Sequence, residues 1–173
     1  AITRILDRNG NILYAAEESS AVEALDPRIA YQVTSILSDV SARPSEYWKT
    51  TLSVPGWEAA AKTGTSNKCL ERYETGDLKG QCKDRKPSDL WTVGATPAIA
   101  AGVWVGNADG SGLFTNAESL ITASPIWKNF MVGAHKALEN RADPTKAPKT
   151  FPQPAGLVFP QVSRLSGELP TEC

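Results

Sequence analysis

Residues 57–65 read Trp-Glu-Ala-Ala-Ala-Lys-Thr-Gly-Thr, and the rest of the chain is best interpreted outward from this stretch. The small residues Ala59 to Ala61 lead directly into Lys62, and Gly64 follows two residues later. A glycine in a strand carries no side chain, so a ligand or another backbone can approach closely there. The stretch therefore predicts a strand of small residues that leads into a positively charged side chain.

Two apolar segments follow this strand along the chain. Residues 90–95 and 99–107 each have the composition of a strand, and only Thr96-Pro97-Ala98 separates them. A connection that short makes the two strands antiparallel neighbours. At the start of the chain, residues 2–6 and 11–15 predict a β-hairpin, because Asn9-Gly10 between them tolerates the positive φ of a tight turn.

Two segments have the apolar spacing of helices. Residues 27–40 begin with Pro27 at the first helical position after Asp26, a good N-cap. Residues 125–138 follow Ser124, and we expect this helix to bury Ile126, Phe130, Ala134, Ala137 and Leu138. The order of elements predicts an α+β fold, in which an antiparallel sheet is flanked by helices.

The chain divides by composition into two parts. We assign residues 1–140 to the folded body and expect the polar residues 66–88 to form an exposed loop insertion within it. Residues 141–173 hold half of the 12 prolines and predict an extended tail.

Single residues outside the motif have ordinary interpretations. We expect His135 at the surface and the run Lys83 to Lys86 to be solvated. The tryptophans at strand and helix positions, Trp91, Trp104 and Trp127, are expected in the core.

Charge and composition exclude several classes of function. The formal net charge is −1, so nothing favours nucleic acid or an anionic membrane surface as a partner. No apolar run is long enough to span a bilayer, and any membrane anchor would lie outside this sequence. The single histidine and three cysteines do not have metal-ligand spacing, so we expect no metal and no cofactor.

The tripeptide Lys62-Thr63-Gly64 matches one of the three motifs of penicillin-binding proteins and serine β-lactamases. The chain resembles the C-terminal portion of the transpeptidase domain of bifunctional, class A-type penicillin-binding proteins, and this implies part of their fold. The similarity runs in order over nearly the whole chain, through residues 6–13, 26–33, 89–97, 102–107, 123–131 and 162–170.

The resemblance implies roles for the motif residues. It makes Lys62, Thr63, Gly64 and Thr65 the substrate-binding strand, with Lys62 attracting substrate anions and ordering nearby hydroxyl groups. Gly64 would allow a peptide or β-lactam to approach the backbone. The Thr65 hydroxyl would bind a substrate carboxylate, and its backbone N–H would face the oxyanion, so Lys62 and Thr65 are the catalytic candidates.

The family's other two motifs, Ser-x-x-Lys and Ser-x-Asn, are not present in this sequence. We therefore expect a fragment of a peptidoglycan D,D-transpeptidase that is inactive alone, with its nucleophile in a missing N-terminal part of the same domain. The parent would bind stem peptides and β-lactams through a serine acyl-enzyme. Members of the family usually add a membrane anchor and a glycosyltransferase domain, and they work on the periplasmic, extracytoplasmic side of the bacterial membrane.

That location also implies a disulfide between Cys69 and Cys82, because disulfides persist outside the cytoplasm. The alternative is a solvated loop with two incidental thiols. Two other functions stay open: a serine β-lactamase, although the proline-rich tail argues against it, and a catalytically dead scaffold module that binds without reacting. Sequence upstream of Ala1 would separate these interpretations.

Overall fold

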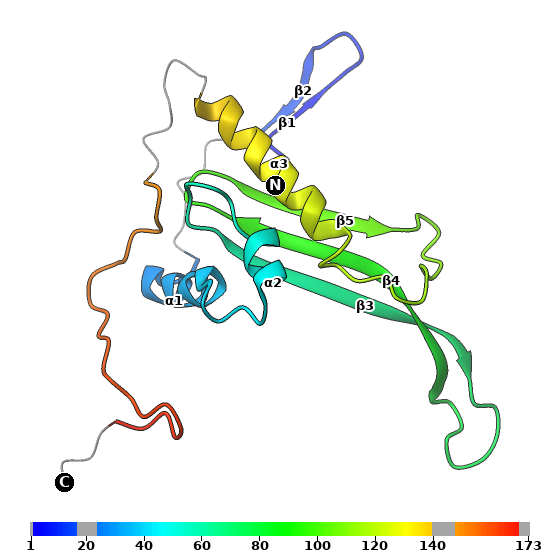
Figure 1. Ribbon diagram of the computed structural model, residues 1–173. Helices are drawn as coiled ribbons and strands as arrows, with labels where there is room; N and C mark the ends of the chain where they lie inside the picture. The colour runs from blue at the N-terminus through cyan, green and yellow to red at the C-terminus, as the bar shows by residue number, and fades with distance from the viewer. Residues whose placement is uncertain (1, 17–23, 140–147, 170–173) are drawn as a thin grey trace.

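The structure is a computed structural model, and it describes residues 2–16, 24–139 and 148–169 (Figure 1). The described elements, in chain order, are β1 (Arg4–Leu6), β2 (Ile12–Ala15), α1 (Pro27–Ser38), α2 (Glu46–Thr51), β3 (Ala60–Arg72), β4 (Cys82–Ala95), β5 (Ala100–Gly106) and α3 (Ala123–Glu139). Antiparallel strands combined with helices confirm the predicted α+β class.

The main sheet has the strand order β3-β4-β5, and both pairings are antiparallel. The short connection at residues 96–99 joins β4 to β5, as predicted from the sequence. Strands β1 and β2 form a separate two-stranded sheet, which confirms the N-terminal hairpin. In the described part of the chain no strand pairs with the outer side of β3, so β3 is an edge strand.

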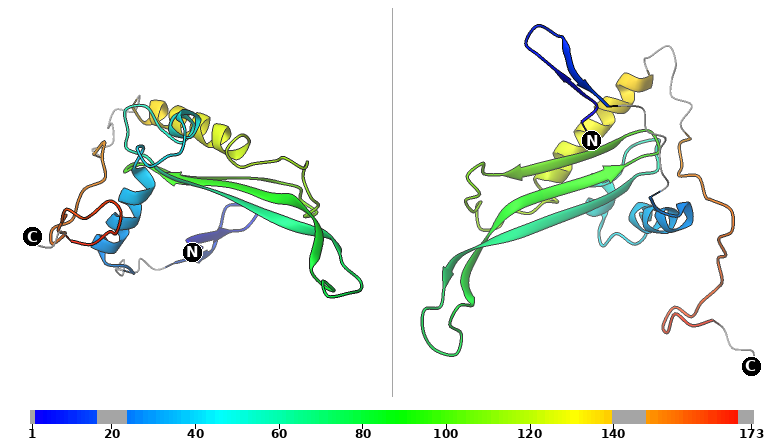
Figure 2. Two further views of the ribbon diagram at one scale, coloured as in Figure 1. Left: turned by 60° about the horizontal axis from the view of Figure 1, so that its bottom comes forward. Right: turned by 180° about the vertical axis from the view of Figure 1, so that it is seen from behind.

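Helix α3 crosses one face of the main sheet, and the hairpin lies on the other side (Figure 2). The indole of Trp127 is fully buried and lies over Gly94 of β4, where a Cβ atom would come within 2.5 Å of Trp127 Cζ2. The indole N–H donates to the carbonyl oxygen of Ala101 at 3.2 Å. This packing fixes the helix to β4 and β5, and any larger residue at position 94 would displace it.

The buried side of α3 differs from the one we predicted. Ile126 and Phe130 are 53% and 55% exposed, so that part of the prediction was wrong. The buried residues are instead Ala123, Ser124, Trp127, Met131 and His135. The physical reason is that buried polar side chains of α3 bond to the sheet: the hydroxyls of Ser124 and Thr92 are 2.8 Å apart, and His135 Nε2 is 3.0 Å from the Thr96 hydroxyl.

The core lies between this face of the sheet, α3 and the segments around them. One cluster of buried residues comprises Leu52, Val54, Ala59, Ala61, Leu120, Trp127 and Met131. A second, smaller cluster comprises Leu90, Ala117 and Ala123. Leu120 belongs to the first cluster and Ala117 to the second, so the segment between β5 and α3 is built into the core.

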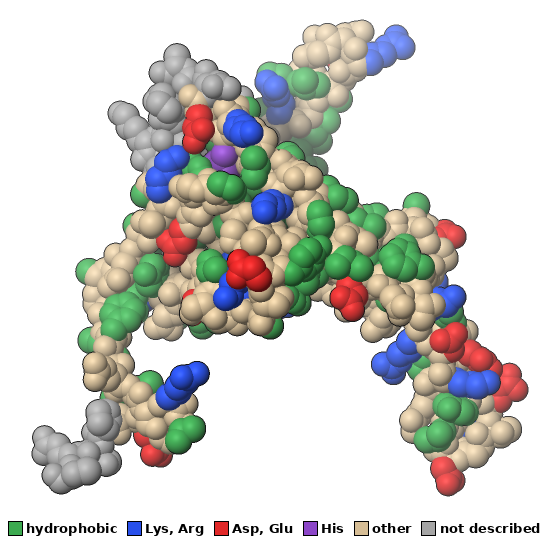
Figure 3. All heavy atoms as spheres, viewed as in Figure 1, with side chains coloured by type: hydrophobic (Ala, Val, Ile, Leu, Met, Phe, Trp, Pro, Cys, Tyr) green, Lys and Arg blue, Asp and Glu red, His purple; other side chains and the backbone are tan. Residues whose placement is uncertain are grey.

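The predicted loop at residues 66–88 is wrong over most of its length. Strands β3 and β4 continue in antiparallel register as far as Arg72 opposite Cys82, and only residues 73–81 connect them. The result is a two-stranded ribbon that projects beyond β5 and carries acidic and basic side chains at its end (Figure 3). A disulfide joins Cys69 to Cys82 across it. A ribbon without a buried face shows no alternation of apolar and polar residues, which is why the sequence pattern suggested a loop.

The other face of the main sheet and much of α1 are exposed. Trp91 and Trp104 pair across β4 and β5 and are 45% and 43% exposed, so of the three tryptophans only Trp127 lies in the core as expected. Helix α1 has its predicted N-cap, because the Asp26 carboxylate accepts the Arg28 backbone N–H. Its apolar residues Ile29, Val33 and Ile36 nevertheless face solvent in the described structure.

The described part of the tail, residues 148–169, contains no helix or strand and runs past α1. One carboxylate attaches its beginning to the body. Glu58 accepts the Phe151 backbone N–H at 2.8 Å and the Ser38 hydroxyl at 2.9 Å, while its own N–H donates to the Lys149 carbonyl oxygen. Residues 140–147 and 170–173 lie outside the described residues, and so does Cys173.

His135 is buried rather than exposed, which corrects the prediction. Its ring stacks on Trp57 with the ring centres 4.2 Å apart, and its Nε2 lies 3.0 Å from the Thr96 hydroxyl. The Lys149 ammonium sits on the indole of Trp57, 3.6 Å from its centre. Burial is the main cause that lowers the pKa of His135, and Lys149 lowers it further while Glu139 raises it.

We predict that this histidine makes the fold less stable in mild acid. The pKa of His135 in the folded state is below the ordinary 6.5, so the unfolded chain binds the proton more readily. Stability is therefore lost as the pH falls below about 6.5, the pKa of the histidine in the unfolded chain. The free energy of unfolding should therefore decrease between about pH 7.5 and about pH 5. His135→Gln should flatten this slope, since the chain has one histidine. An unchanged slope in the variant would contradict the assignment.

We also predict that the ribbon disulfide forms in protein made in an oxidising compartment. It closes a ring from residue 69 to residue 82, which should stabilise the chain by on the order of 3 kcal/mol. In a Cys173→Ser background, thiol titration should find no reactive thiol until a reductant is added. The double variant Cys69→Ser, Cys82→Ser should then unfold at lower denaturant concentration than this background protein.

Candidate functional site

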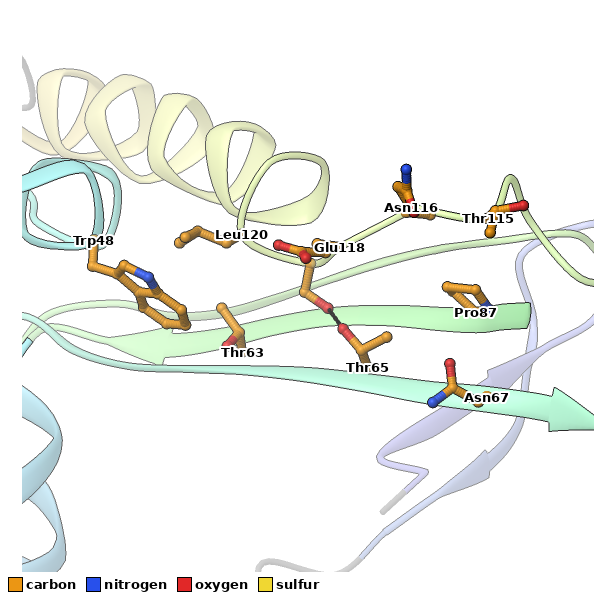
Figure 4. Close-up of a pocket in the computed structure, with 11 residues that line it drawn as sticks. Trp48, Thr63, Thr65, Asn67, Pro87, Thr115, Asn116, Glu118 and Leu120 are labelled. Atoms are coloured by element: carbon orange, nitrogen blue, oxygen red, sulfur yellow. Dashed lines mark hydrogen bonds between the residues drawn. The ribbon is translucent and has the colours of Figure 1, made fainter. Parts of the chain in front are cut away.

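The motif strand presents different residues on its two faces, because side chains alternate along a strand. Thr63 and Thr65 face the side of α3 and line a groove there (Figure 4). Lys62 and Gly64 are on the other face, where a Cβ atom on Gly64 would lie 3.8 Å from that of Trp91. The structure thus brings the two threonines together and separates them from the lysine side chain.

The groove has a volume of about 430 Å³ and lies between β3, α2 and the segment that leads into α3. Polar side chains dominate its β3 wall and the opposite wall, and Trp48 of α2 closes one end (Figure 4). Its lining residues are Trp48, Thr63, Thr65, Asn67, Pro87, Thr115, Asn116, Ala117, Glu118, Ser119 and Leu120.

Ser119 links the two walls of the groove. Its hydroxyl donates to the Gly64 carbonyl oxygen at 2.7 Å and lies 2.8 Å from the Thr65 hydroxyl. A hydroxyl group has one proton, and a carbonyl oxygen can only accept. With the Ser119 proton on Gly64, the Thr65 proton must point to Ser119. Thr65 therefore offers the groove acceptor lone pairs, and its hydroxyl can donate to a ligand only by releasing Ser119.

Lys62 is exposed, and its ammonium donates to the carbonyl oxygen of Thr63 at 2.6 Å. This contact holds the side chain along the unpaired edge of β3. The charge lies next to a second hollow, of about 280 Å³, which α1, α2 and the start of β3 surround. Trp48 and Thr63 belong to both hollows, so they separate the charged side of the strand from the groove.

A carboxylate on the Lys62 face ties the three strands together just beyond the motif. Asp89 accepts the Ser66 hydroxyl at 2.8 Å, the Ser88 hydroxyl at 2.9 Å and the Trp104 indole N–H at 3.0 Å. These bonds, that of Ser66 first, lower the pKa of Asp89 below its ordinary value. The anchored carboxylate fixes the position of β3 relative to β4 and β5.

Sequence reasoning found the motif strand and missed the opposite wall of the groove. Ser119 and Glu118 lie in a polar segment without a motif, and Trp48 lies on a short helix that we did not predict. The only hint in the sequence is the mixed pattern of residues 115–120, where alternate positions are small or apolar.

The described residues contain neither a cluster of metal-ligand side chains nor a helix that could span a membrane. No group of three or more histidine, cysteine, aspartate or glutamate side chains there could hold a metal ion. Within the same residues, no helix has the length and apolar character needed to cross a bilayer.

Comparison with known proteins gives one consistent result. No protein-family model matches the chain. The penicillin-binding protein 1A of Clostridium tetani is 31% identical over 97% of this chain, and that of Mycobacterium tuberculosis is 29% identical over 88% of it. The protein of the same name from Clostridium botulinum is 27% identical over 98%.

These relatives are much longer than this sequence. The chain spans 18% of the Clostridium tetani protein and 16% of the Mycobacterium tuberculosis protein. The matches run across the groove, the motif strand and the three-stranded sheet, because they cover nearly the whole chain. From the repeated match to proteins of one name, and from the α+β fold around a Lys-Thr-Gly edge strand, we conclude that the chain belongs to the penicillin-binding protein family, of the 1A type.

Proposed function

We propose that this chain is the C-terminal part of a peptidoglycan D,D-transpeptidase domain that also binds penicillin. The observation that carries the proposal is the position of the Lys-Thr-Gly strand. β3 is the edge strand of the main sheet in the described structure, and its threonines line a groove. An extended peptide can therefore lie along this edge with its side groups in the groove.

The chemistry would take place in two steps. A serine outside this sequence attacks the carbonyl carbon of the penultimate D-alanine of a stem peptide. The amide C–N bond breaks, and the terminal D-alanine leaves with the proton from the serine hydroxyl. An amine of a second stem then attacks the resulting ester, the ester C–O bond breaks, and the proton from the amine returns to the serine oxygen.

The motif residues would assist both steps. The Thr65 backbone N–H would donate to the oxyanion that develops on the attacked carbonyl group. Lys62 would supply a positive charge on the other face of the strand, beside the hollow that α1 and α2 border. Gly64 leaves the strand open to a ligand backbone. The Thr65 hydroxyl would bind the substrate carboxylate after giving up its bond to Ser119.

Two exposed apolar surfaces support a larger parent domain. Ile29, Val33 and Ile36 form one stripe on α1, and Trp91, Val93 and Trp104 form another on the sheet face opposite α3. Apolar surfaces of this kind usually contact another part of the protein. We propose that the N-terminal part of the transpeptidase domain covers them and brings the nucleophile to Lys62.

The parent protein would work at the extracytoplasmic side of the bacterial membrane and be attached to it by an upstream anchor. The Cys69–Cys82 disulfide supports this location, since such bonds persist outside the cytoplasm. Peptidoglycan stem peptides and β-lactams would be its ligands.

The first test is covalent labelling with a fluorescent penicillin. Residues 1–173 alone should form no stable adduct, because Lys62 and Thr65 would position a ligand without supplying the acylated hydroxyl. The longer parent protein should form one adduct per molecule, measured by intact mass. A stoichiometric adduct on residues 1–173, or none on the parent, would each refute the proposal.

In the parent protein, Lys62→Ala should slow acylation by a β-lactam and by its methyl ester alike, because the charge acts on the chemistry of every ligand. Thr65→Val retains the backbone N–H and removes only the hydroxyl. Thr65→Val should therefore slow acylation by the free acid and not by the ester. The activation free energy should rise by roughly 1.5–3 kcal/mol, the value of a hydrogen bond to a charged group. The measurement is the second-order acylation rate of each ligand. Equal losses for acid and ester in Thr65→Val would remove the carboxylate role of this hydroxyl.

A further inference from the structure

The groove beside β3 has a negative charge of its own. Glu118 is the only charged side chain among the residues that line it, and the others are neutral. Figure 4 shows the Glu118 side chain on the wall across from Thr63 and Thr65. A groove that had to hold only the carboxylate of a substrate would gain nothing from an anion in this position, because like charges repel.

The position of Glu118 is fixed by its neighbours. Ala117 and Ser119 on either side are 2% exposed, and the Ser119 hydroxyl bonds to β3. The Glu118 carbonyl oxygen accepts the Thr122 hydroxyl, and the Ser119 carbonyl oxygen accepts the Ser124 N–H at the start of α3. The backbone therefore holds the Cα atom of Glu118 at the edge of the groove, and the side chain extends from there as an exposed group.

No lysine neutralises Glu118 within the described residues, where it takes part in no ion pair. Three lysines on the elements that border the groove have other partners: Lys62 donates to the Thr63 carbonyl oxygen, Lys68 to that of Gly110, and Lys128 to that of Thr50. The charge thus remains available to a ligand.

Thr65 adds a second acceptor on the opposite wall of the groove. Its proton points to Ser119, as the Ser119–Gly64 bond requires, so its free lone pairs face the groove. A carboxylate and a hydroxyl oxygen that only accept are suited to a ligand rich in N–H donors. An ammonium group, with three donors and a positive charge, satisfies both.

We propose that Glu118 is a specificity-determining residue that binds the amine of the acceptor stem in the second step. This rests on the proposed transpeptidase function. While the donor is bound, its carboxylate would accept a hydrogen bond from the Thr65 hydroxyl. Once the terminal D-alanine has left, the Thr65 hydroxyl again donates its hydrogen bond to Ser119, and the emptied groove presents acceptors to the incoming amine. The bound ammonium first loses one proton to water, and the neutral amine then attacks the ester. Its second proton passes to the serine oxygen as the ester C–O bond breaks.

The test uses the parent protein, a D-alanyl thioester as donor and glycinamide as the amine acceptor, with glycolamide as the hydroxyl analogue. Glu118→Gln should raise the KM for glycinamide by at least about tenfold, and Glu118→Asp by less. The difference in KM between glycinamide and glycolamide should be smaller in Glu118→Gln than in the wild-type protein. Because the removed charge repels a carboxylate, acylation by a carboxylate-bearing β-lactam should become faster in the same variant.

Glu74→Gln is the matched control, because Glu74 lies in the connection at the far end of the ribbon and outside the groove. It should retain the wild-type KM for glycinamide. A wild-type KM in Glu118→Gln would overturn the inference, and so would a parallel fall in acylation and aminolysis, which indicates general damage to the site. If the wild-type parent were not acylated at all, the proposed function itself would fail.

Discussion

The packing of Trp127 against Gly94 is the constraint on which the rest of the structure depends. The indole fits over β4 only because position 94 lacks a side chain, and it is bonded to β5 through the Ala101 carbonyl oxygen. This contact sets the distance of α3 from the sheet. The start of α3 in turn determines where Ala117 and Leu120 enter the core, and residues 117–120 form one wall of the groove. The geometry of the groove therefore depends on the contact between Trp127 and Gly94, although neither residue lines the groove.

Elements with local signals could be predicted from the sequence. The hairpin has its Asn-Gly turn, α1 has Asp26 and Pro27, and the short connection after β4 fixes its pairing with β5. The ribbon could not be predicted, because both of its faces meet solvent and its residues show no alternation. The buried side of α3 was also missed, since Ser124 and His135 count as polar in any pattern. In the fold Thr92 bonds to Ser124, and Thr96 bonds to one ring nitrogen of His135.

The candidate site shows the same division. The Lys-Thr-Gly stretch is recognisable because it is short and continuous, and it identifies one wall. The other wall comes from Ser119, 54 residues along the chain from Thr65, and a serine has no signature of its own. Ser119 matters because its hydroxyl has a single proton, which it donates to the Gly64 carbonyl oxygen. The Thr65 hydroxyl must then donate to Ser119. Such a relation exists only once the two segments are adjacent in space.

The covalent ring at the end of the ribbon has a consequence for how this part of the molecule tolerates change. The connection at residues 73–81 lies inside the ring that Cys69 and Cys82 close, and it contacts none of the core clusters. A protease cut there would leave both strands attached, and the ladder between β3 and β4 would keep its register. The tip is therefore a suitable place to insert a peptide tag or a fluorophore. The Lys-Thr-Gly motif lies at the opposite end of β3 and would keep its conformation.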